Sequence, residues 1–245
     1  MYHKLSNTAS RTTLEKEFNK RFKYPNLYQK QILINGIDEV TIPIIPMEEE
    51  NLIVPAIWGI LPENYKDDWS VFQNIFNSLN LNINSLDNPS WYSNALLNRR
   101  CLIPVTGFFT SYLVDGILYP YYFHRKSGLP FCLSGVYNKL EDGFLSCTII
   151  TTLNQQGPTA VQNIDGSIPL LFPKDLNQKW LSPQINKNDI QEMLNSTANY
   201  SLIAHPISKE FFKNNISYTS MLEPVYYEKA PRGMILKHGV ELLTL

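Results

Sequence analysis

The side chains that most often do chemistry, cysteine and histidine, are few and widely spaced in this sequence. Cys101, Cys132 and Cys147 each lie in an apolar run without CxxC spacing. Their odd number favours buried free thiols in a reducing compartment over a disulfide framework. We expect no metal and no cofactor, because the histidines do not form the closely spaced pairs of a zinc site. The histidines are His3, His124, His205 and His238.

One apolar segment has the form of a site without its acid. Residues 98–112, NRRCLIPVTGFFTSY, indicate a strand, a tight turn and a second strand. Such a hairpin often presents a catalytic carboxylate, but Thr110 stands at the corresponding position and the segment has no acid and no histidine. It is a working site, a site that has lost its chemistry, or a core hairpin.

The elements that would position such a site are mostly short strands. A capping-box pattern at Thr12 to Glu15 predicts a helix over about 13–22. Residues 29–62 read as strands and turns, helical patterns begin at Asp67 and Pro89, and the second of these ends at Arg99 and Arg100.

The chain from 101 to 153 reads as an antiparallel meander. Asp115-Gly116, Ser127-Gly128 and Asp142-Gly143 are the expected hairpin joints. A strand over 168–173, helices over 175–181 and 188–194, and a strand over 201–208 follow. We therefore predict an α+β fold: a β-rich single domain, mainly antiparallel strands forming an open barrel-like core with peripheral helices.

Composition gives no sign of a membrane or of a strongly charged partner. Charged residues are 18% of the chain, the net charge is -1 and the isoelectric point is about 6.4. A large electrostatic field is absent, so any nucleic-acid binding must be local. No apolar stretch is long enough for a membrane helix, and no signal-like segment begins the chain. We expect one domain over 1–245, a monomer, in the cytoplasm.

Several short motifs, in order, resemble those of the SRAP family, the SOS response-associated, abasic-site-processing proteins. Each motif is weak alone, but their order and spacing together indicate the family. The motifs are Trp58-Gly59-Ile60-Leu61-Pro62, Arg99-Arg100-Cys101-Leu102-Ile103-Pro104, Gly107-Phe108-Phe109, Tyr119-Pro120-Tyr121, Ile149-Ile150-Thr151-Thr152, Pro169-Leu170-Leu171, Lys179-Trp180-Leu181 and His205-Pro206-Ile207-Ser208.

The resemblance implies a known chemistry. Family members expose a cysteine at position 2, and its amine and thiol close on the aldehyde of an abasic site as a thiazolidine crosslink. An asparagine, a glutamate and a histidine position the sugar and move protons. The same groups perform self-cleavage after the initiator methionine, and the crosslink shields single-stranded DNA.

The nucleophile of the family is missing from this sequence. Tyr2 stands where the cysteine belongs. A phenol, with a pKa of about 10, cannot close the thiazolidine ring. A side chain as large as that of Tyr2 also disfavours removal of Met1, so we expect neither crosslinking nor self-cleavage.

The remaining family positions are mostly substituted as well. The asparagine falls on Asn80, while the acid becomes Thr110 and the histidine becomes Gln162. A shorter loop would place Asp165 at the histidine position instead. Two arginines that contact DNA in the family become Asn82 and Ser167.

Loss of these arginines predicts weaker DNA binding, because each phosphate contact contributes to affinity and to its salt dependence. Lys4, Arg99 and Arg100 are candidate substitutes, although Arg99 and Arg100 also suit a helix C-terminus. Tyr65, next to Asn64 in the place of the family aromatic, could stack on a base or pack in a loop.

Two classes of function follow. The first is a degenerate family member that has lost catalysis and binds single-stranded DNA non-covalently. The alternative is a protein-interaction or regulatory scaffold without nucleic-acid binding, in keeping with the acidic isoelectric point and with the segment Tyr119-Pro120-Tyr121-Tyr122. A protease acting on other proteins is disfavoured, since no nucleophile and base are paired near the expected site.

Overall fold

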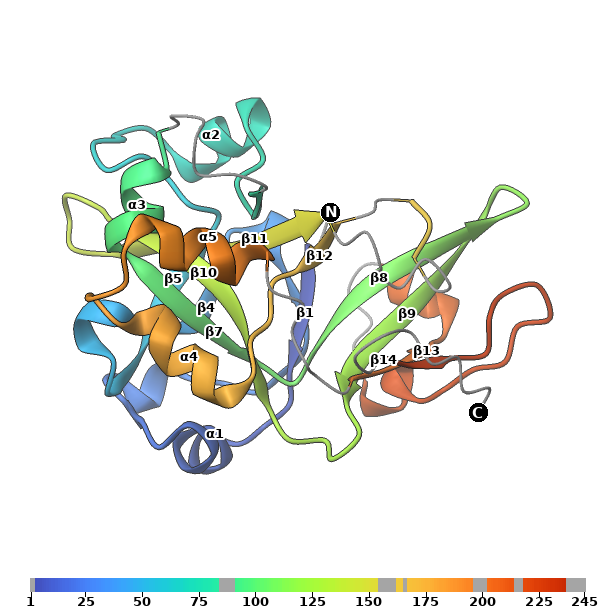
Figure 1. Cartoon of the computed structure of the whole chain (residues 1–245). Helices are drawn as coiled ribbons and strands as arrows, with labels where there is room; N and C mark the ends of the chain where they lie inside the picture. Colours follow the sequence, from blue (N-terminus) through green and yellow to red (C-terminus); the bar gives the residue numbers. More distant parts are fainter. Residues whose placement is uncertain are drawn as a thin grey trace.

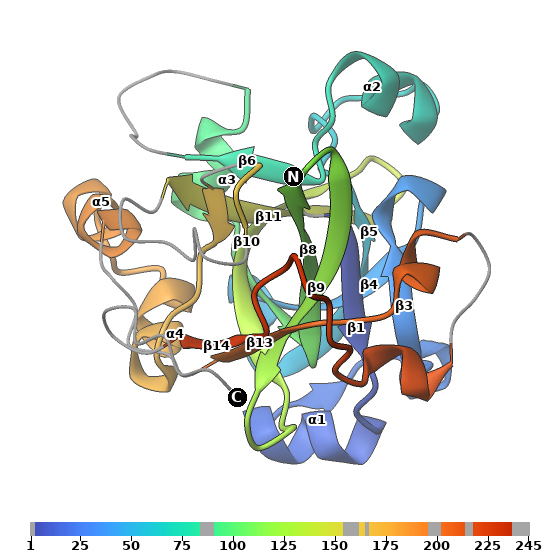
Figure 2. The same cartoon turned by 90° about the vertical axis from the view of Figure 1, so that its right-hand side faces the viewer.

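The sheet that carries Thr110 runs through the middle of Figure 2, where its two longest strands cross the view. A computed structural model describes residues 3–83, 91–153, 162–164, 167–195, 202–213 and 218–236. In this part of the chain the six-stranded sheet has the order β14-β13-β9-β8-β1-β3, with every pairing antiparallel. Its strands are β1 (Lys4–Asn7), β3 (Gln31–Asn35), β8 (Gly107–Val114), β9 (Ile117–Arg125), β13 (Leu202–Pro206) and β14 (Met234–Leu236).

The second sheet holds the other strands of the described residues, and the α-helices lie around it (Figure 1). Its order is β12-β11-β10-β7-β4-β5-β2, and β6 also pairs with β11. Most pairings are antiparallel, whereas β5 and β6 run parallel to β11 and β2 runs parallel to β5. Its strands are β2 (Arg21–Phe22), β4 (Thr41–Pro46), β5 (Leu52–Trp58), β6 (Asn80–Asn82), β7 (Arg100–Val105), β10 (Phe131–Lys139), β11 (Leu145–Leu153) and β12 (Ser167–Pro169).

The helices are short and lie at the periphery. The α-helices are α1 (Arg11–Phe18), α2 (Trp69–Ile75), α3 (Ser93–Asn98), α4 (Lys174–Leu181) and α5 (Lys187–Asn195). Single 3₁₀ turns are η1 (Pro25–Leu27), η2 (Gly36–Asp38), η3 (Met47–Glu49), η4 (Lys209–Phe212) and η5 (Thr219–Leu222). The fold is thus α+β and β-rich, with mainly antiparallel strands in an open barrel-like core and helices outside it, as predicted.

The first helix begins and ends earlier than its sequence pattern predicts. Ser10, rather than Thr12, is the N-cap, since its hydroxyl accepts the Thr13 amide at 3.1 Å. Asn19 then adopts a left-handed conformation with φ 54°, which ends the helix at Phe18. Arg21 and Phe22 form β2 instead of a last helical turn.

The predicted hairpin over residues 98–112 is wrong. The strands β7 and β8 follow each other in the chain but lie in different sheets, so Thr106 marks a corner between them. The Thr106 amide donates to the Ser6 carbonyl at 2.9 Å, which fixes this corner to β1. Gly107 is needed there, because a Cβ would lie 2.2 Å from the Tyr122 ring and 2.5 Å from the Phe123 carbonyl oxygen.

Of the three predicted hairpin joints, two connect paired strands. Asp115 and Gly116, with φ 50° and 72°, join β8 to β9, as a type I′ turn requires. The turn before β11 has Gly143 at φ 88° and joins β10 to β11. Ser127-Gly128 instead connects β9 to β10, which belong to different sheets, so the meander from 101 to 153 is interrupted there.

The core contains polar groups that are paired with backbone atoms. The Trp58 indole donates to the Leu79 carbonyl at 3.0 Å, and the Trp180 indole donates to the Cys101 carbonyl at 3.0 Å. All three cysteines are buried and free, as predicted, and burial raises the pKa of each thiol. A raised thiol pKa disfavours the reactive thiolate, so the cysteines act as small apolar core residues.

Candidate functional site

A hollow at two of the substituted family positions lies beside the start of β1 and along β8. It is a cavity of about 360 Å³. Thr110 and Gln162 both line it, although they are far apart in the chain. Its complete described lining is His3, Lys4, Phe109, Thr110, Ser111, Leu118, Gln162, Ile164, Phe211 and Phe212.

The cavity forms where β8 continues beyond the residues that pair with β1. Strand β1 pairs with β8 only at Leu5 with Phe108 and at Ser6 with Gly107. Farther along the same edge of β8, the Asn163 side chain accepts the Leu113 amide at 2.8 Å and donates to the Leu113 carbonyl at 2.7 Å. Backbone polar groups alternate between the two edges of a strand, so those of Ser111 face the same gap.

The two substituted catalytic positions are uncharged and held in place. Thr110 pairs with Tyr121 in β9, and its hydroxyl oxygen is buried with no hydrogen-bond partner among the described residues. Gln162 is 7% exposed, and its amide donates to the Ser167 carbonyl at 3.0 Å. Neither side chain can act as a general acid or base at neutral pH, because neither titrates there.

Lys4 is the basic group of this cavity. Its ammonium nitrogen lies 3.3 Å from the Phe211 carbonyl oxygen and 4.4 Å from the centroid of the Phe211 ring. Burial lowers the pKa of the Lys4 amine, and the Asp38 carboxylate acts in the opposite direction. Among the described residues of the lining, Lys4 is the one lysine, and burial partly desolvates its charge.

Asn80 and Asn82 are not among the described residues that line the cavity. Both belong to β6, where Asn80 pairs with Ile149 and Asn82 with Thr151 of β11. Asn80 is half-buried, whereas Asn82 is exposed. The structure thus brings Thr110 and Gln162 together with His3 and Lys4, which follow position 2 in the chain. Asn80 is not in the described lining. Tyr2 and Asp165 lie outside the described residues.

Arg100 is fully buried, which removes it from the candidate DNA contacts. Its guanidinium donates to the carbonyls of Trp180 at 2.8 Å, Ser182 at 2.7 Å and Leu96 at 3.2 Å, and also to that of Leu97. These carbonyls lie at the C-terminal ends of α3 and α4. Carbonyl groups at a helix end have no partner within the helix, and the Arg100 guanidinium supplies one. Burial lowers the pKa of Arg100 to about 10, so the group stays charged at neutral pH. Arg100 is a structural residue.

The other two predicted surface contacts are also engaged within the protein. Arg99 forms an ion pair with Glu63 and donates to the Asn138 side chain at 3.1 Å. Tyr65 donates to the Asp68 carbonyl at 3.1 Å and packs edge-on against Phe72, with ring centroids 5.2 Å apart. Both arrangements favour the packing interpretation over direct DNA contact.

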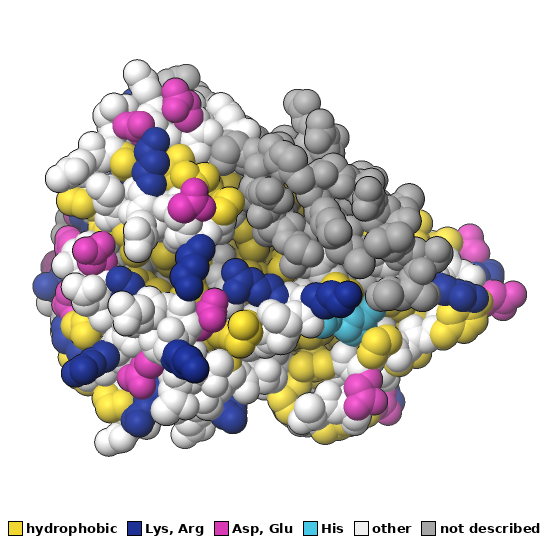
Figure 3. All heavy atoms as spheres, turned by 60° about the horizontal axis from the view of Figure 1, so that its bottom comes forward, with side chains coloured by type: hydrophobic (Ala, Val, Ile, Leu, Met, Phe, Trp, Pro, Cys, Tyr) yellow, Lys and Arg dark blue, Asp and Glu magenta, His cyan; other side chains and the backbone are white. Residues whose placement is uncertain are grey.

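Charges of both signs are mixed on the described surface. In Figure 3, lysine and arginine side chains lie in a loose row across the middle of the visible face, with acidic side chains among them. Several basic groups are paired, including Arg125 with Glu17 at 3.3 Å and Lys23 with Glu49 at 2.8 Å.

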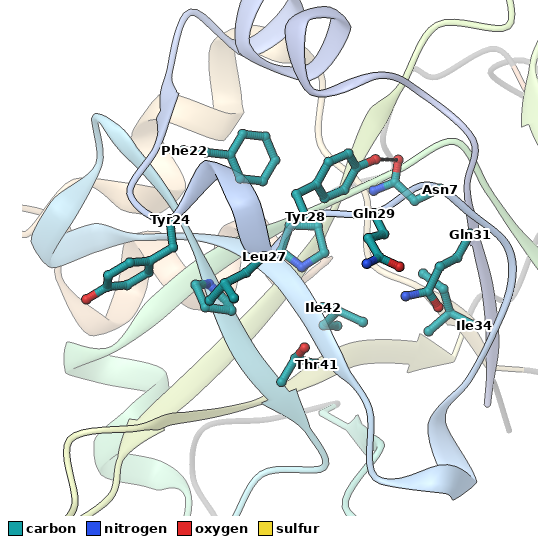
Figure 4. A pocket seen from close by; sticks show the side chains of 12 residues that line it. Asn7, Phe22, Tyr24, Leu27, Tyr28, Gln29, Gln31, Ile34, Thr41 and Ile42 are labelled. Atoms are coloured by element: carbon teal, nitrogen blue, oxygen red, sulfur yellow. Dashed lines mark hydrogen bonds between the residues drawn. The ribbon is translucent and has the colours of Figure 1, made fainter.

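A second, smaller cavity of about 50 Å³ lies between β1, β3, β4 and the segment before β3 (Figure 4). The Tyr28 hydroxyl donates to Asn7 Oδ1 at 3.2 Å and to the Ala9 carbonyl at 2.8 Å. Thr41, Gln29 and Gln31 are also polar residues of its lining. Its volume is too small for a nucleotide.

Two negative findings concern only the described residues. No group of three or more His, Cys, Asp or Glu side chains could hold a metal ion in this part of the chain. No helix of the described ranges is long and apolar enough to cross a membrane.

Sequence reasoning missed His3, Ser111 and the pair Phe211-Phe212, which all line the cavity. The phenylalanines follow the His205-Pro206-Ile207-Ser208 motif, and η4 brings them to β1. Only the position of that motif could have pointed to them, because the contact joins chain segments about 200 residues apart.

Several solved structures share the fold of this chain. A Bacteroides thetaiotaomicron protein gives a TM-score of 0.80 at 19% identity, covering 91% of this chain and all of that one. A Bordetella bronchiseptica protein gives 0.68 at 16% identity, covering 84% and 99%. A phage-related protein of Bordetella bronchiseptica gives 0.63 at 15% identity, covering 84% and 94%. At these identities the likeness shows the fold alone.

Sequence relatives add a family. Proteins called abasic site processing protein YoqW, from Bacillus subtilis and from Bacillus phage SPbeta, are each 25% identical to the chain over 142 residues. The match covers 56% of this chain and 60% of each relative's length. The profile of the SOS response associated peptidase family matches residues 1–214. The chain therefore belongs to the SRAP family.

Proposed function

We propose that this protein binds abasic single-stranded DNA non-covalently, in the cavity beside β1 and β8, and forms no thiazolidine crosslink. The observation that carries the proposal is the shared lining: Thr110 and Gln162 face one cavity together with His3, the neighbour of position 2. The relatives named for abasic-site processing and the family membership support the choice of ligand.

The chemistry of the lining supports binding without a stable crosslink. Tyr2 supplies no thiol, so the ring that makes the family's product permanent cannot close. Thr110 and Gln162 replace a carboxylate and an imidazole by a hydroxyl and an amide, which bind polar groups but do not transfer protons near neutral pH. A sugar would be held by hydrogen bonds and by the apolar rings of Phe109, Phe211 and Phe212.

Affinity for undamaged DNA should be modest. Lys4 is the lysine of the cavity, while Arg99 and Arg100 are engaged inside the protein. With one or two phosphate contacts, log affinity should fall with log salt with a slope of only about -0.7 to -1.4. We also propose that residues 1–245 act as one domain and as a cytoplasmic monomer. The family match over 1–214 and the pairing of β14 with β13 support the single domain.

A native gel and a denaturing gel, run on the same mixture, test the proposal. The protein is mixed with a single-stranded oligonucleotide that carries one abasic site, and half the sample is heated without reductant. We expect a complex in the native sample and free oligonucleotide after heating. A heat-stable adduct would contradict the loss of crosslinking, and absence of a native complex would contradict binding.

An exposed aromatic cluster favours the scaffold function as a second candidate. Phe72, Phe76 and Trp91 contact each other edge-on with ring centroids 5.5 to 6.1 Å apart. Ile75, in the same helix, is 84% exposed, and Phe76 and Trp91 are each 39% exposed. Exposed apolar clusters of this kind mark protein contacts. Ile75→Glu places a charge in this cluster. Salt-dependent binding of single-stranded DNA that is the same in Ile75→Glu and wild type would support the DNA-binding function and count against the scaffold function.

A further inference from the structure

Lys4 lines the cavity and is half-buried, and its amine is held against Phe211. The residue belongs to β1, and its neighbour Leu5 is fully buried opposite Phe108, so the backbone at this point is fixed. The Nζ atom lies 3.3 Å from the Phe211 carbonyl oxygen and over the Phe211 ring. A lysine that is placed by packing in this way can approach a bound group without first losing side-chain freedom.

The surroundings of Lys4 favour the neutral amine more than water does. Burial is the larger influence and lowers the pKa of the Lys4 amine, while Asp38 opposes it. A lysine that loses its proton more readily is a better nucleophile, since only the neutral amine has a free electron pair. The Thr110 and Ser111 hydroxyls line the same cavity and can hydrogen-bond a reacting group, while the His3 imidazole can donate or accept a proton.

We propose that Lys4 is an amine nucleophile that forms a reversible imine with the ring-opened aldehyde of an abasic sugar in this cavity. The inference rests on the proposed function, because the imine would form only after the abasic strand has bound non-covalently in the cavity. The cavity of about 360 Å³ is within the usual size range for sites that enclose a small molecule, and a sugar with one flanking phosphate is of that size.

The step balances without a further reagent. The electron pair of the neutral Lys4 amine attacks the aldehyde carbon, so a carbon–nitrogen bond forms as the carbonyl π bond opens. One amine proton moves to the oxygen, and the second leaves with the hydroxyl group as water. No thiol stands beside the imine to close a ring onto it, so water can reverse the reaction. The imine is therefore compatible with the absence of a heat-stable product.

Reductive trapping tests this step. The full-length protein is incubated with the abasic oligonucleotide and sodium cyanoborohydride, which converts an imine into a stable secondary amine. Lys4→Arg keeps the positive charge and removes the nucleophilic amine. Lys209→Arg is the matched control, because Lys209 also lies over an aromatic ring, 4.1 Å from the centroid of Tyr119, but does not line the cavity.

We expect a heat-stable adduct only with reductant and only with the aldehyde, and peptide mapping should place it on Lys4. Lys4→Arg should lower the adduct yield about tenfold or more, while Lys209→Arg leaves it unchanged. Lys209→Arg, outside the cavity, should also bind an oligonucleotide with a tetrahydrofuran site, which has no aldehyde, as wild type does.

The outcomes separate the two proposals. Wild-type binding of the tetrahydrofuran oligonucleotide without trapping would overturn the imine and leave the proposed function standing. An adduct that persists in Lys4→Arg, or that maps to another amine, would also overturn it. Absence of both binding and trapping would overturn the imine together with the proposed function.

Discussion

Asn163 completes the edge of β8 with its side chain, accepting the Leu113 amide at 2.8 Å and donating to the Leu113 carbonyl at 2.7 Å. The amide group of an asparagine has the same donor and acceptor as a peptide unit, so it can stand in for a neighbouring strand at one residue. Between Asn163 and the end of β1 the edge of β8 borders the cavity.

Removing this side chain should loosen the edge of β8. Asn163→Ala deletes two hydrogen bonds to an exposed backbone position, which water partly replaces, and should cost about 1 kcal/mol. We expect amide exchange at Leu113 to become about fivefold faster, as measured by hydrogen exchange. Asn74→Ala, an exposed asparagine of α2, is the control. Unchanged exchange at Leu113 would show that the side chain does not hold the strand.

Arg100 should matter for stability and not for DNA binding. Arg100→Met leaves the carbonyls of Trp180, Leu96 and Ser182 without their buried donor, at a cost of about 3 kcal/mol or more in the free energy of unfolding. Lys66→Met, which breaks an exposed pair with Glu141, should cost less than about 1 kcal/mol. Urea denaturation compares the two variants. Similar midpoints would refute the role of Arg100 as a buried donor.

Stability should fall in mild acid because of two histidines in neighbouring strands. The rings of His124 and His205 lie 5.2 Å apart beside Tyr122, and burial lowers the pKa of both in the folded state. Their contribution is complete above the unfolded-state pKa of about 6.5 and is lost as the pH falls through the lowered folded-state values.

The melting temperature should therefore drop between about pH 7.5 and pH 5.5, and His205→Gln should reduce that drop. The backbone partners do not titrate: the His205 ring contacts the Leu222 carbonyl and the His124 ring the Arg125 carbonyl. A wild-type drop that is equally large in His205→Gln would assign the pH dependence to other groups.

Rebuilding the family's groups tests the residue assignments. Tyr2→Cys alone should restore removal of Met1 but little crosslinking, because Thr110 and Gln162 still provide no acid or base. Adding Thr110→Glu and Gln162→His should give a heat-stable adduct with abasic single-stranded DNA on a denaturing gel. A folded triple variant without an adduct would show that the assignment of these positions, or the shape of the cavity, is wrong.

Local patterns predicted most elements of this fold. The Asp115-Gly116 turn and the helix after Asp67 depend on neighbours in the chain, and both are present. The helix ends at Ile75, earlier than the apolar pattern through Leu79 predicts. The route between sheets depends on distant contacts. Thr106 turns the chain because it meets Ser6, a residue 100 positions away, and no local pattern distinguishes that corner from a hairpin.

The candidate site was predictable only in part, for the same reason. The positions of Thr110 and Gln162 followed from motif order, and both line one cavity. Arg100 has the same local sequence signature as a solvated helix-terminal arginine, but the carbonyls of α4 that surround it come from 80 residues later in the chain. Phe211 reaches Lys4 by a similarly long connection.

The most direct test of the central claim is a measurement of which cavity binds single-stranded DNA. Fluorescence anisotropy with a labelled single-stranded oligonucleotide carrying a tetrahydrofuran site compares wild type, Thr110→Phe in the large cavity and Thr41→Phe in the small one. We predict that filling the large cavity weakens binding about tenfold or more, while Thr41→Phe binds like wild type, with circular dichroism confirming that both variants fold. Equal affinity of all three proteins, or loss of binding only in Thr41→Phe, would contradict the account.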